Sequence, residues 1–169
     1  MLHEIEFGDF YQFRAKGHLT VVSTKFDGDK KLGSEIVLDS SNLIVTLART
    51  FFPVAVTNPD DHNYILKYMA FGQGHHAAGD PDTPVQPRIS ETVLEDELYR
   101  HDITSYTYPS NVSTSIYTLV LTTEGNIASY YTEFGLFADA GMFAIRAADN
   151  GRVEKNDTIQ LELYWRLLF

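Results

Sequence analysis

The chain has 169 residues, 44% of them hydrophobic and 13% aromatic, with a formal net charge of −10 and no cysteine. This composition excludes a disordered chain, a disulfide framework, thiolate metal sites and a cysteine nucleophile. The acidic balance opposes binding to a nucleic-acid backbone through a broad basic surface, so we expect no nucleic-acid partner. No apolar run approaches the roughly 20 residues that span a bilayer, and nothing at the start resembles a signal peptide. We therefore expect no membrane partner and folding in a reducing cytoplasm.

Residues 1–39 begin with a dense row of aromatic side chains and continue into a predicted strand at residues 18–26. The row consists of Phe7, Phe10, Tyr11 and Phe13. Exposed apolar groups at this density usually mark a partner surface. We expect this segment to supply N-terminal strands that contact neighbouring copies, with the four aromatic residues at the interface. The alternative is that they fold back into the same core.

Residues 40–53 show helical spacing. Ser40 and Ser41 are candidate N-caps, and Pro53 ends the segment. The apolar residues between them are Leu43, Ile44, Leu47, Ala48 and Phe51. Their spacing predicts one amphipathic helix of about three turns that packs against the sheets.

The rest of the chain reads as short strands separated by turns. Residues 63–71, 102–108 and 113–123 are rich in β-branched and aromatic side chains, and residues 129–147 read as two strands around the turn at Asp139 to Gly141. This pattern predicts a mainly β fold, an antiparallel β-sandwich over residues 40–169 that is continuous with the N-terminal strands.

The C-terminal residues give the clearest strand signal. Ile159, Leu161, Leu163, Trp165, Leu167 and Phe169 recur at period two and alternate with more polar residues. This alternation predicts a half-buried antiparallel strand over residues 158–168. We expect Leu163, Trp165 and Phe169, together with Phe137, in the core.

Residues 72–90 form a predicted long loop with three glycines and three prolines. His75 and His76 are candidate interface residues in it, and residues 89–103 could form a short helical turn after it. A metal-assisted hydrolase could be built from the two histidines with Asp80 and Asp82. Adjacent residues on an extended backbone point in opposite directions, which favours a polar loop over a metal site. No cofactor is predicted.

Glu133 interrupts an apolar and aromatic run. A glycosidase needs two carboxylates that face each other, and no partner stands at a defined spacing. A carboxylate beside a turn can instead accept backbone N–H bonds or pair with Arg146 or Lys155. We predict that Glu133, Arg146 and Lys155 are structural anchors and that the chain is not an enzyme.

Tyrosines could form a sugar-binding platform. They are Tyr106, Tyr108, Tyr117, Tyr130 and Tyr131. Aromatic residues in strands more often pack in a core or an interface, so carbohydrate binding stays the minority alternative.

The stretch YYTEFGLFADAGMFAIR, followed by VEKNDTIQLELYWRLLF, resembles a recurring C-terminal pattern of structural proteins from tailed bacteriophages and prophages. The matching residues are Glu133, Gly135, Leu136, Phe137, Arg146, Lys155, Trp165 and Phe169. Upstream, Asn42 at the start of the predicted helix, the strand ending YMAFGQG, and Leu94, Glu97 and Arg100 also fit. The resemblance covers residues 40–169.

This resemblance implies a non-enzymatic virion protein with a β-sandwich, assembled in the host cytoplasm. We expect a tail, baseplate or fibre-attachment component that contacts other phage structural proteins as a homo-oligomer or multi-copy ring. A capsid or neck decoration protein and a carbohydrate-binding module for host recognition are the alternatives.

Overall fold

The structure is a computed structural model that describes residues 15–51, 54, 57, 58, 60–109, 113–125 and 128–168. Strands dominate it, and the strand pairs are antiparallel, which confirms the predicted mainly β class. The strands are β1 (Lys16–Asp27), β2 (Lys30–Ile44), β3 (Leu66–Gly72), β4 (His76–Ala77), β5 (Asp80–Pro84), β6 (Glu97–Asp102), β7 (Ser105–Thr107), β8 (Thr114–Leu121), β9 (Ser129–Tyr131), β10 (Glu133–Ala138), β11 (Gly141–Ala147), β12 (Val153–Lys155) and β13 (Ile159–Leu168).

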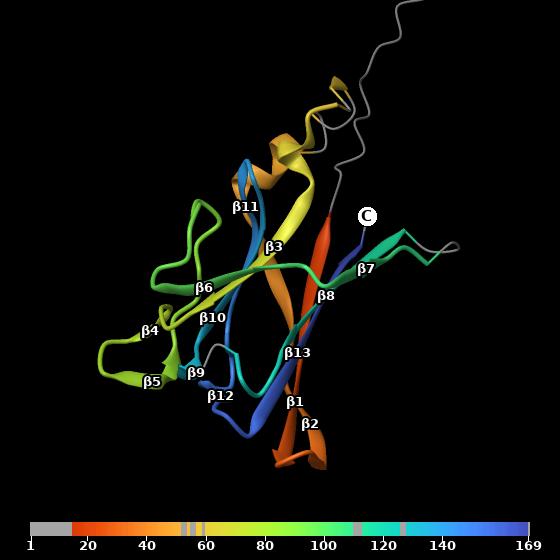
Figure 1. Cartoon of the computed structure of the whole chain (residues 1–169). Helices are drawn as coiled ribbons and strands as arrows, with labels where there is room; N and C mark the ends of the chain where they lie inside the picture. Colours follow the sequence, from red (N-terminus) through yellow and green to blue (C-terminus); the bar gives the residue numbers. More distant parts are fainter. Residues whose placement is uncertain are drawn as a thin grey trace, which may run out of the picture.

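Nine strands form one continuous sheet in the order β6-β3-β10-β11-β2-β1-β13-β8-β7, curled into a half-barrel (Figure 1). Two small sheets, β12-β9 and β4-β5, lie beside it. The predicted sandwich of two separate layers is therefore replaced by one curled sheet. Only Ile103 and Thr104 join the edge strand β6 to the opposite edge strand β7, so the curl brings these two edges to one corner.

One half of the sheet is built on β13. Its residues alternate between buried and more exposed positions, as the sequence predicts for residues 158–168. Trp165 pairs with Leu19 of β1 and Tyr117 of β8. Leu163 and Trp165 are fully buried. The period-two pattern thus places one face of this half in the core.

The other half is built on β10, whose six residues are all buried. β10 lies between β3 and β11 in the sheet. Leu94, from the segment between β5 and β6, packs against Gly135 on one face. Because both faces are covered, the strand reads as a nearly continuous apolar run. Phe137 is buried in it.

The predicted helix over residues 40–53 is wrong. Residues 40–44 continue β2, where Asn42 pairs with Gly17 and Ile44 pairs with Ala144. A 3-10 helix, η1 (Thr46–Thr50), follows without a side-chain cap. Pairing with two strands distant in sequence overrides the helical spacing, and the β-branched Ile44 suits a strand.

The two segments proposed for assembly lie differently in the fold. Most of residues 16–39 pair within the central sheet, so strands from both predicted ranges, 1–39 and 40–169, share it. The loop at 72–90 contains the β4-β5 hairpin. In the stretch 89–103, which could form a short helical turn, residues 89 and 90 form a turn and β6 occupies residues 97–102. The proposed residues Phe7, Phe10, Tyr11, Phe13 and Phe169 lie outside the described residues. In the described part of the chain, no helix is long and apolar enough to cross a bilayer.

Candidate functional site

Glu133 begins β10 and is fully buried. Its Oε1 accepts hydrogen bonds from the backbone N–H of Gly74 (3.2 Å) and Asp96 (2.7 Å). Its Oε2 accepts one from the backbone N–H of Glu95 (3.0 Å) and lies 2.6 Å from Nδ1 of His75. One carboxylate therefore joins the residues that follow β3 to the residues that precede β6.

His75 lies in this loop with an unusual backbone conformation. Its φ of 57° falls in the left-handed region, which costs free energy for a residue with a side chain. Its ring Nε2 lies 2.8 Å from Oε2 of Glu91, and its backbone N–H donates to Oε2 of Glu95 (2.6 Å). With Glu133 on Nδ1, both ring nitrogens face carboxylates, so both donate when the ring is protonated. We call His75, Glu91, Glu95 and Glu133 the His75–Glu133 cluster.

Each charged group of this cluster stabilises the charged form of its partner. Burial acts to lower the pKa of His75, but the hydrogen bonds and charges of Glu133 and Glu91 outweigh it and raise that pKa above its ordinary value. Burial acts to raise the pKa of Glu133, but His75 and the N–H groups of Asp96 and Glu95 outweigh it and lower that pKa. The geometry favours an imidazolium held between two carboxylates.

Two glycines allow the loop to reach Glu133. A Cβ at Gly72 would lie 2.0 Å from the carbonyl oxygen of Asp96, and one at Gly74 would lie 2.6 Å from Cβ of Glu95. The backbone N–H of Gln73 donates to the same Asp96 carbonyl at 3.0 Å. The Gly-x-Gly that ends the strand is thus required by close backbone approach.

Of the two kinds of partner predicted for Glu133, the structure shows backbone N–H groups, whereas Arg146 and Lys155 contact other groups. Phe134, not Glu133, is the register partner of Arg146, and successive residues of a strand point to opposite faces. Arg146 forms an ion pair with Asp149 instead. Lys155 is fully buried on β12, where Nζ donates to the carbonyl oxygens of Asn156 (3.0 Å) and Thr123 (3.4 Å).

The residues proposed as metal ligands do not point to a common site. His76 places Nδ1 2.8 Å from the carbonyl oxygen of Ala77, and Asp80 accepts from the Thr83 hydroxyl at 2.6 Å. Within the described ranges, no group of three or more His, Cys, Asp or Glu residues is arranged to hold a metal ion. His75, which we predicted as a candidate interface residue, has its side chain buried in the cluster.

Sequence reasoning missed Glu91 and Glu95, although they supply two of the four side chains of the cluster. They lie in a stretch that we predicted to be a helical turn. Glu91 also accepts a hydrogen bond from the backbone N–H of Arg88 (2.9 Å). Only the course of the loop places both residues beside His75, and no spacing in the sequence indicates it.

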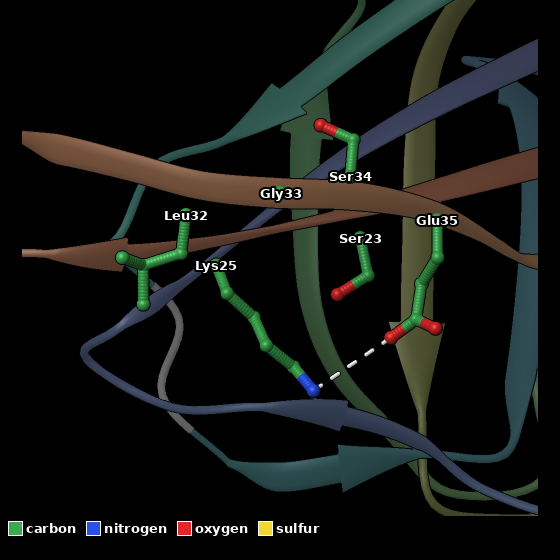
Figure 2. A pocket seen from close by; sticks show the side chains of 6 residues that line it. All are labelled: Ser23, Lys25, Leu32, Gly33, Ser34 and Glu35. Atoms are coloured by element: carbon green, nitrogen blue, oxygen red, sulfur yellow. Dashed lines mark ion pairs between the residues drawn. The ribbon is translucent and has the colours of Figure 1, made fainter.

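The surface offers two further features. Tyr131 and Tyr117 are buried, whereas Tyr106 and Tyr108 are exposed with ring centroids 5.3 Å apart. A solvent-open hollow of ≈ 230 Å³ lies on the β1-β2 hairpin (Figure 2). Its lining consists of Ser23, Lys25, Leu32, Gly33, Ser34 and Glu35.

Comparison with known proteins gives no match: no family model, no curated protein and no solved structure is similar to this chain. The functional proposal therefore rests on the residues and their geometry.

Proposed function

We propose that this chain is a non-enzymatic structural protein of a tailed-bacteriophage virion, placed in the tail, baseplate or fibre-attachment region. It acts there through contacts with other virion proteins and with further copies of itself.

The hydrogen bonds of the His75–Glu133 cluster support the non-enzymatic part of this proposal. Both ring nitrogens of His75 and both carboxylate oxygens of Glu133 already contact groups of the same chain. A general acid or base needs a free position within hydrogen-bond reach of a substrate. Glu133, the acid that the sequence offers as a catalytic candidate, therefore fits an anchor that fixes the loop to the sheet.

Contacts among residues of the phage-like pattern also support the proposal. Leu94 lies against Gly135, and the Arg100 guanidinium lies 3.9 Å from the centroid of the Phe137 ring. Arg100 also forms an ion pair with Glu97. The two halves of the pattern, about 40 residues apart in the chain, thus pack on each other as one structural unit.

The test is deletion of the gene in the phage or lysogen that encodes it. The proposal predicts non-infectious particles with defective tails in electron micrographs, and rescue by a plasmid copy. A plasmid copy carrying Glu154→Gln, an exposed change on β12, is the matched control and should rescue fully. Normal particle yield, morphology and infectivity after deletion would contradict the proposal.

Glycan binding is the second candidate, because Tyr106 and Tyr108 are 65% and 58% exposed. Neighbouring exposed aromatic rings can stack on the apolar faces of sugars. A glycan array with the wild type and a Tyr106→Ala/Tyr108→Ala double variant tests it. Binding that is lost in the double variant supports a host-recognition module, and absence of binding removes this candidate.

A further inference from the structure

The outer edge of β2 lacks a strand partner over most of its length. β2 pairs with β1 along residues 30–42, but with β11 only through Leu43 and Ile44. In the described part of the chain, the far side of residues 30–42 thus presents backbone groups without a partner strand; we call it the β2 edge. Such an edge is a template for an added strand.

The β2 edge is exposed and offers an aliphatic side chain on each face. Residues 30–36 are all exposed, with Leu32 and Ile36 at 61% and 64%. Figure 2 shows Leu32 on the same side of the hairpin as Glu35, whereas Ser34 points to the other side. Ile36 shares the side of Ser34, because both belong to one regular stretch of the register with β1. A strand that covers this edge should therefore carry apolar side chains on both of its faces.

The segment before β1 has the composition and length of such a strand. Residues 1–14, which we call the arm, lie outside the described residues and contain Phe7, Phe10, Tyr11 and Phe13. Residues an odd number of positions apart point to opposite faces of a strand, so Phe7 and Phe10 would supply one aromatic ring to each face. At roughly 3.3 Å per residue, an extended arm spans about 46 Å and the β2 edge about 43 Å. The arm therefore matches the edge in length and in apolar character.

Bulges divide the β2 edge into two parts. The register with β1 skips Leu32 and Val37, which leaves regular stretches at 33–36 and 38–42. Gly8 lies near the middle of the arm, and glycine tolerates the backbone conformations of a bulge. We therefore expect two short stretches of pairing rather than one uninterrupted ladder.

The path of β1 assigns the arm to the β2 edge of another copy. Gly17, the second residue of β1, pairs with Asn42, so the arm joins β1 at the end opposite to the hairpin tip. Figure 1 shows the start of β1 in red toward the top of the view and the β1-β2 hairpin tip at the bottom. β11 pairs with Leu43 and Ile44 near the start of β1. To reach the edge of its own chain, the arm would have to reverse direction and pass around this pairing, which a neighbouring copy does not require.

Charges at the hairpin tip set the direction of the arm. Within the described ranges, no ion pair includes Lys30 or Lys31, and these neighbours point to opposite faces of the strand. The arm carries Glu4 and Glu6 near its beginning and Arg14 at its end. An arm parallel to β2 brings its acids to the two lysines, whereas the reverse direction brings Arg14 there. Opposite charges on adjacent strands favour the parallel direction.

We propose that the arm of one copy adds to the sheet of a neighbouring copy as a strand parallel to β2, along residues 30–42. The aromatic side chains of the arm then cover Leu32 and Ile36, and Glu4 and Glu6 lie at the hairpin tip. Because the contact joins different surfaces of the two copies, its repetition builds a ring or an open array. This inference rests on the proposed function, since it names one contact through which copies assemble.

A cross-link between co-expressed copies tests the neighbour and the direction. The chain has no cysteine, and a Cβ added at Gly33 meets no atom within 4 Å. Copies with Gly33→Cys are combined with tagged copies that carry His3→Cys or Gln12→Cys, and a short thiol-specific linker joins cysteines that lie close together. We expect a linked pair with His3→Cys and none with Gln12→Cys, which lies about 30 Å further along an extended arm. Thr107→Cys, exposed on the edge strand β7, replaces Gly33→Cys as the control and should join neither.

Replacements in the full chain test the surface itself. Ile36→Lys places a charge on the β2 edge and should weaken self-association by roughly tenfold or more, measured by sedimentation velocity. Leu98→Lys, on the edge strand β6 and 39% exposed, is the matched control and should leave self-association unchanged. Phe10→Ser should weaken self-association as well. Combined with Ile36→Lys, it should add little further loss, because both variants act on one contact.

The outcomes separate this inference from the proposed function. If a chain with both Gly33→Cys and His3→Cys cross-links within itself while mixed copies do not, the arm lies on its own sheet and the exchange is overturned. A link only at Gln12→Cys overturns the parallel direction. Equal linking of Thr107→Cys, or self-association unchanged in every variant, overturns the β2 contact but leaves assembly intact. A wild type that stays monomeric overturns the exchange altogether, and the gene-deletion phenotype decides independently whether the virion function also fails.

Discussion

Oε2 of Glu133 lies 2.6 Å from Nδ1 of His75, although 58 residues separate them in the chain. Glu133 stands on the central strand β10, and His75 stands in the loop after β3. The pair fixes that loop on the buried strand. Replacement of either residue should therefore lower the free energy of unfolding.

Replacement of Glu133 should destabilise the fold. Glu133→Gln loses the charge and directs an amide N–H₂ toward other donors, and Glu133→Ala leaves several buried donors unpaired. An unpaired buried donor costs about 1–3 kcal/mol, so the alanine variant should lose more free energy of unfolding than the glutamine variant. Urea unfolding measures both. A glutamine variant that keeps wild-type stability but loses a hydrolytic activity would contradict the anchor.

The contribution of the cluster should depend on pH. The folded-state pKa of His75 is raised above 6.5, so its stabilisation is fully present below pH 6.5 and is lost as pH rises through the folded value. The folded-state pKa of Glu133 is lowered below 4.5, so its stabilisation is present above pH 4.5 and is lost as pH falls through the folded value. The stability difference between wild type and His75→Gln should therefore be largest between pH 4.5 and 6.5. A difference that stays constant up to pH 10 would refute this.

Glycine at position 72 should be required for the loop to close. Gly72→Ala forces a Cβ against the Asp96 carbonyl, and the backbone shift should cost about 1–3 kcal/mol. Gly33→Ala is the matched control, because a Cβ there meets open space. Thermal unfolding should show a lower Tm only for the first variant. Equal Tm values for the two variants would mean that the backbone at Gly72 does not lie close to the Asp96 carbonyl.

The alternation of buried and exposed residues along β13 should appear as unequal stability losses when its leucines are replaced. Leu163→Ala removes a fully buried side chain and should cost about 2–5 kcal/mol. Leu168→Ala, on the opposite face and 42% exposed, should cost much less. Comparable losses in urea unfolding would show that the strand is not half-buried.

Local sequence patterns predicted those strands whose own residues carry the signal, either a period of two or a turn between two strands. The period of two over residues 158–168 and the turn at Asp139 to Gly141 are sufficient for β13 and for the β10-β11 pair. The same logic failed for residues 40–44, because β1 and β11 impose a strand there from a distance.

The candidate site shows the same limit. Glu133 drew attention as an acid in an apolar run, and a role in accepting backbone N–H bonds was foreseeable. Its partner His75 was not, because the contact depends on the path of a loop that returns through Glu95 and Asp96. Arg146 seemed a plausible partner until the register placed it opposite Phe134.

Quantitative mass spectrometry of gradient-purified phage particles tests the virion assignment most directly. We expect the chain to sediment with the tail proteins at a fixed number of copies per particle, and tail-less particles to lack it. A chain that remains in the soluble fraction while complete, infectious particles sediment without it would contradict the account.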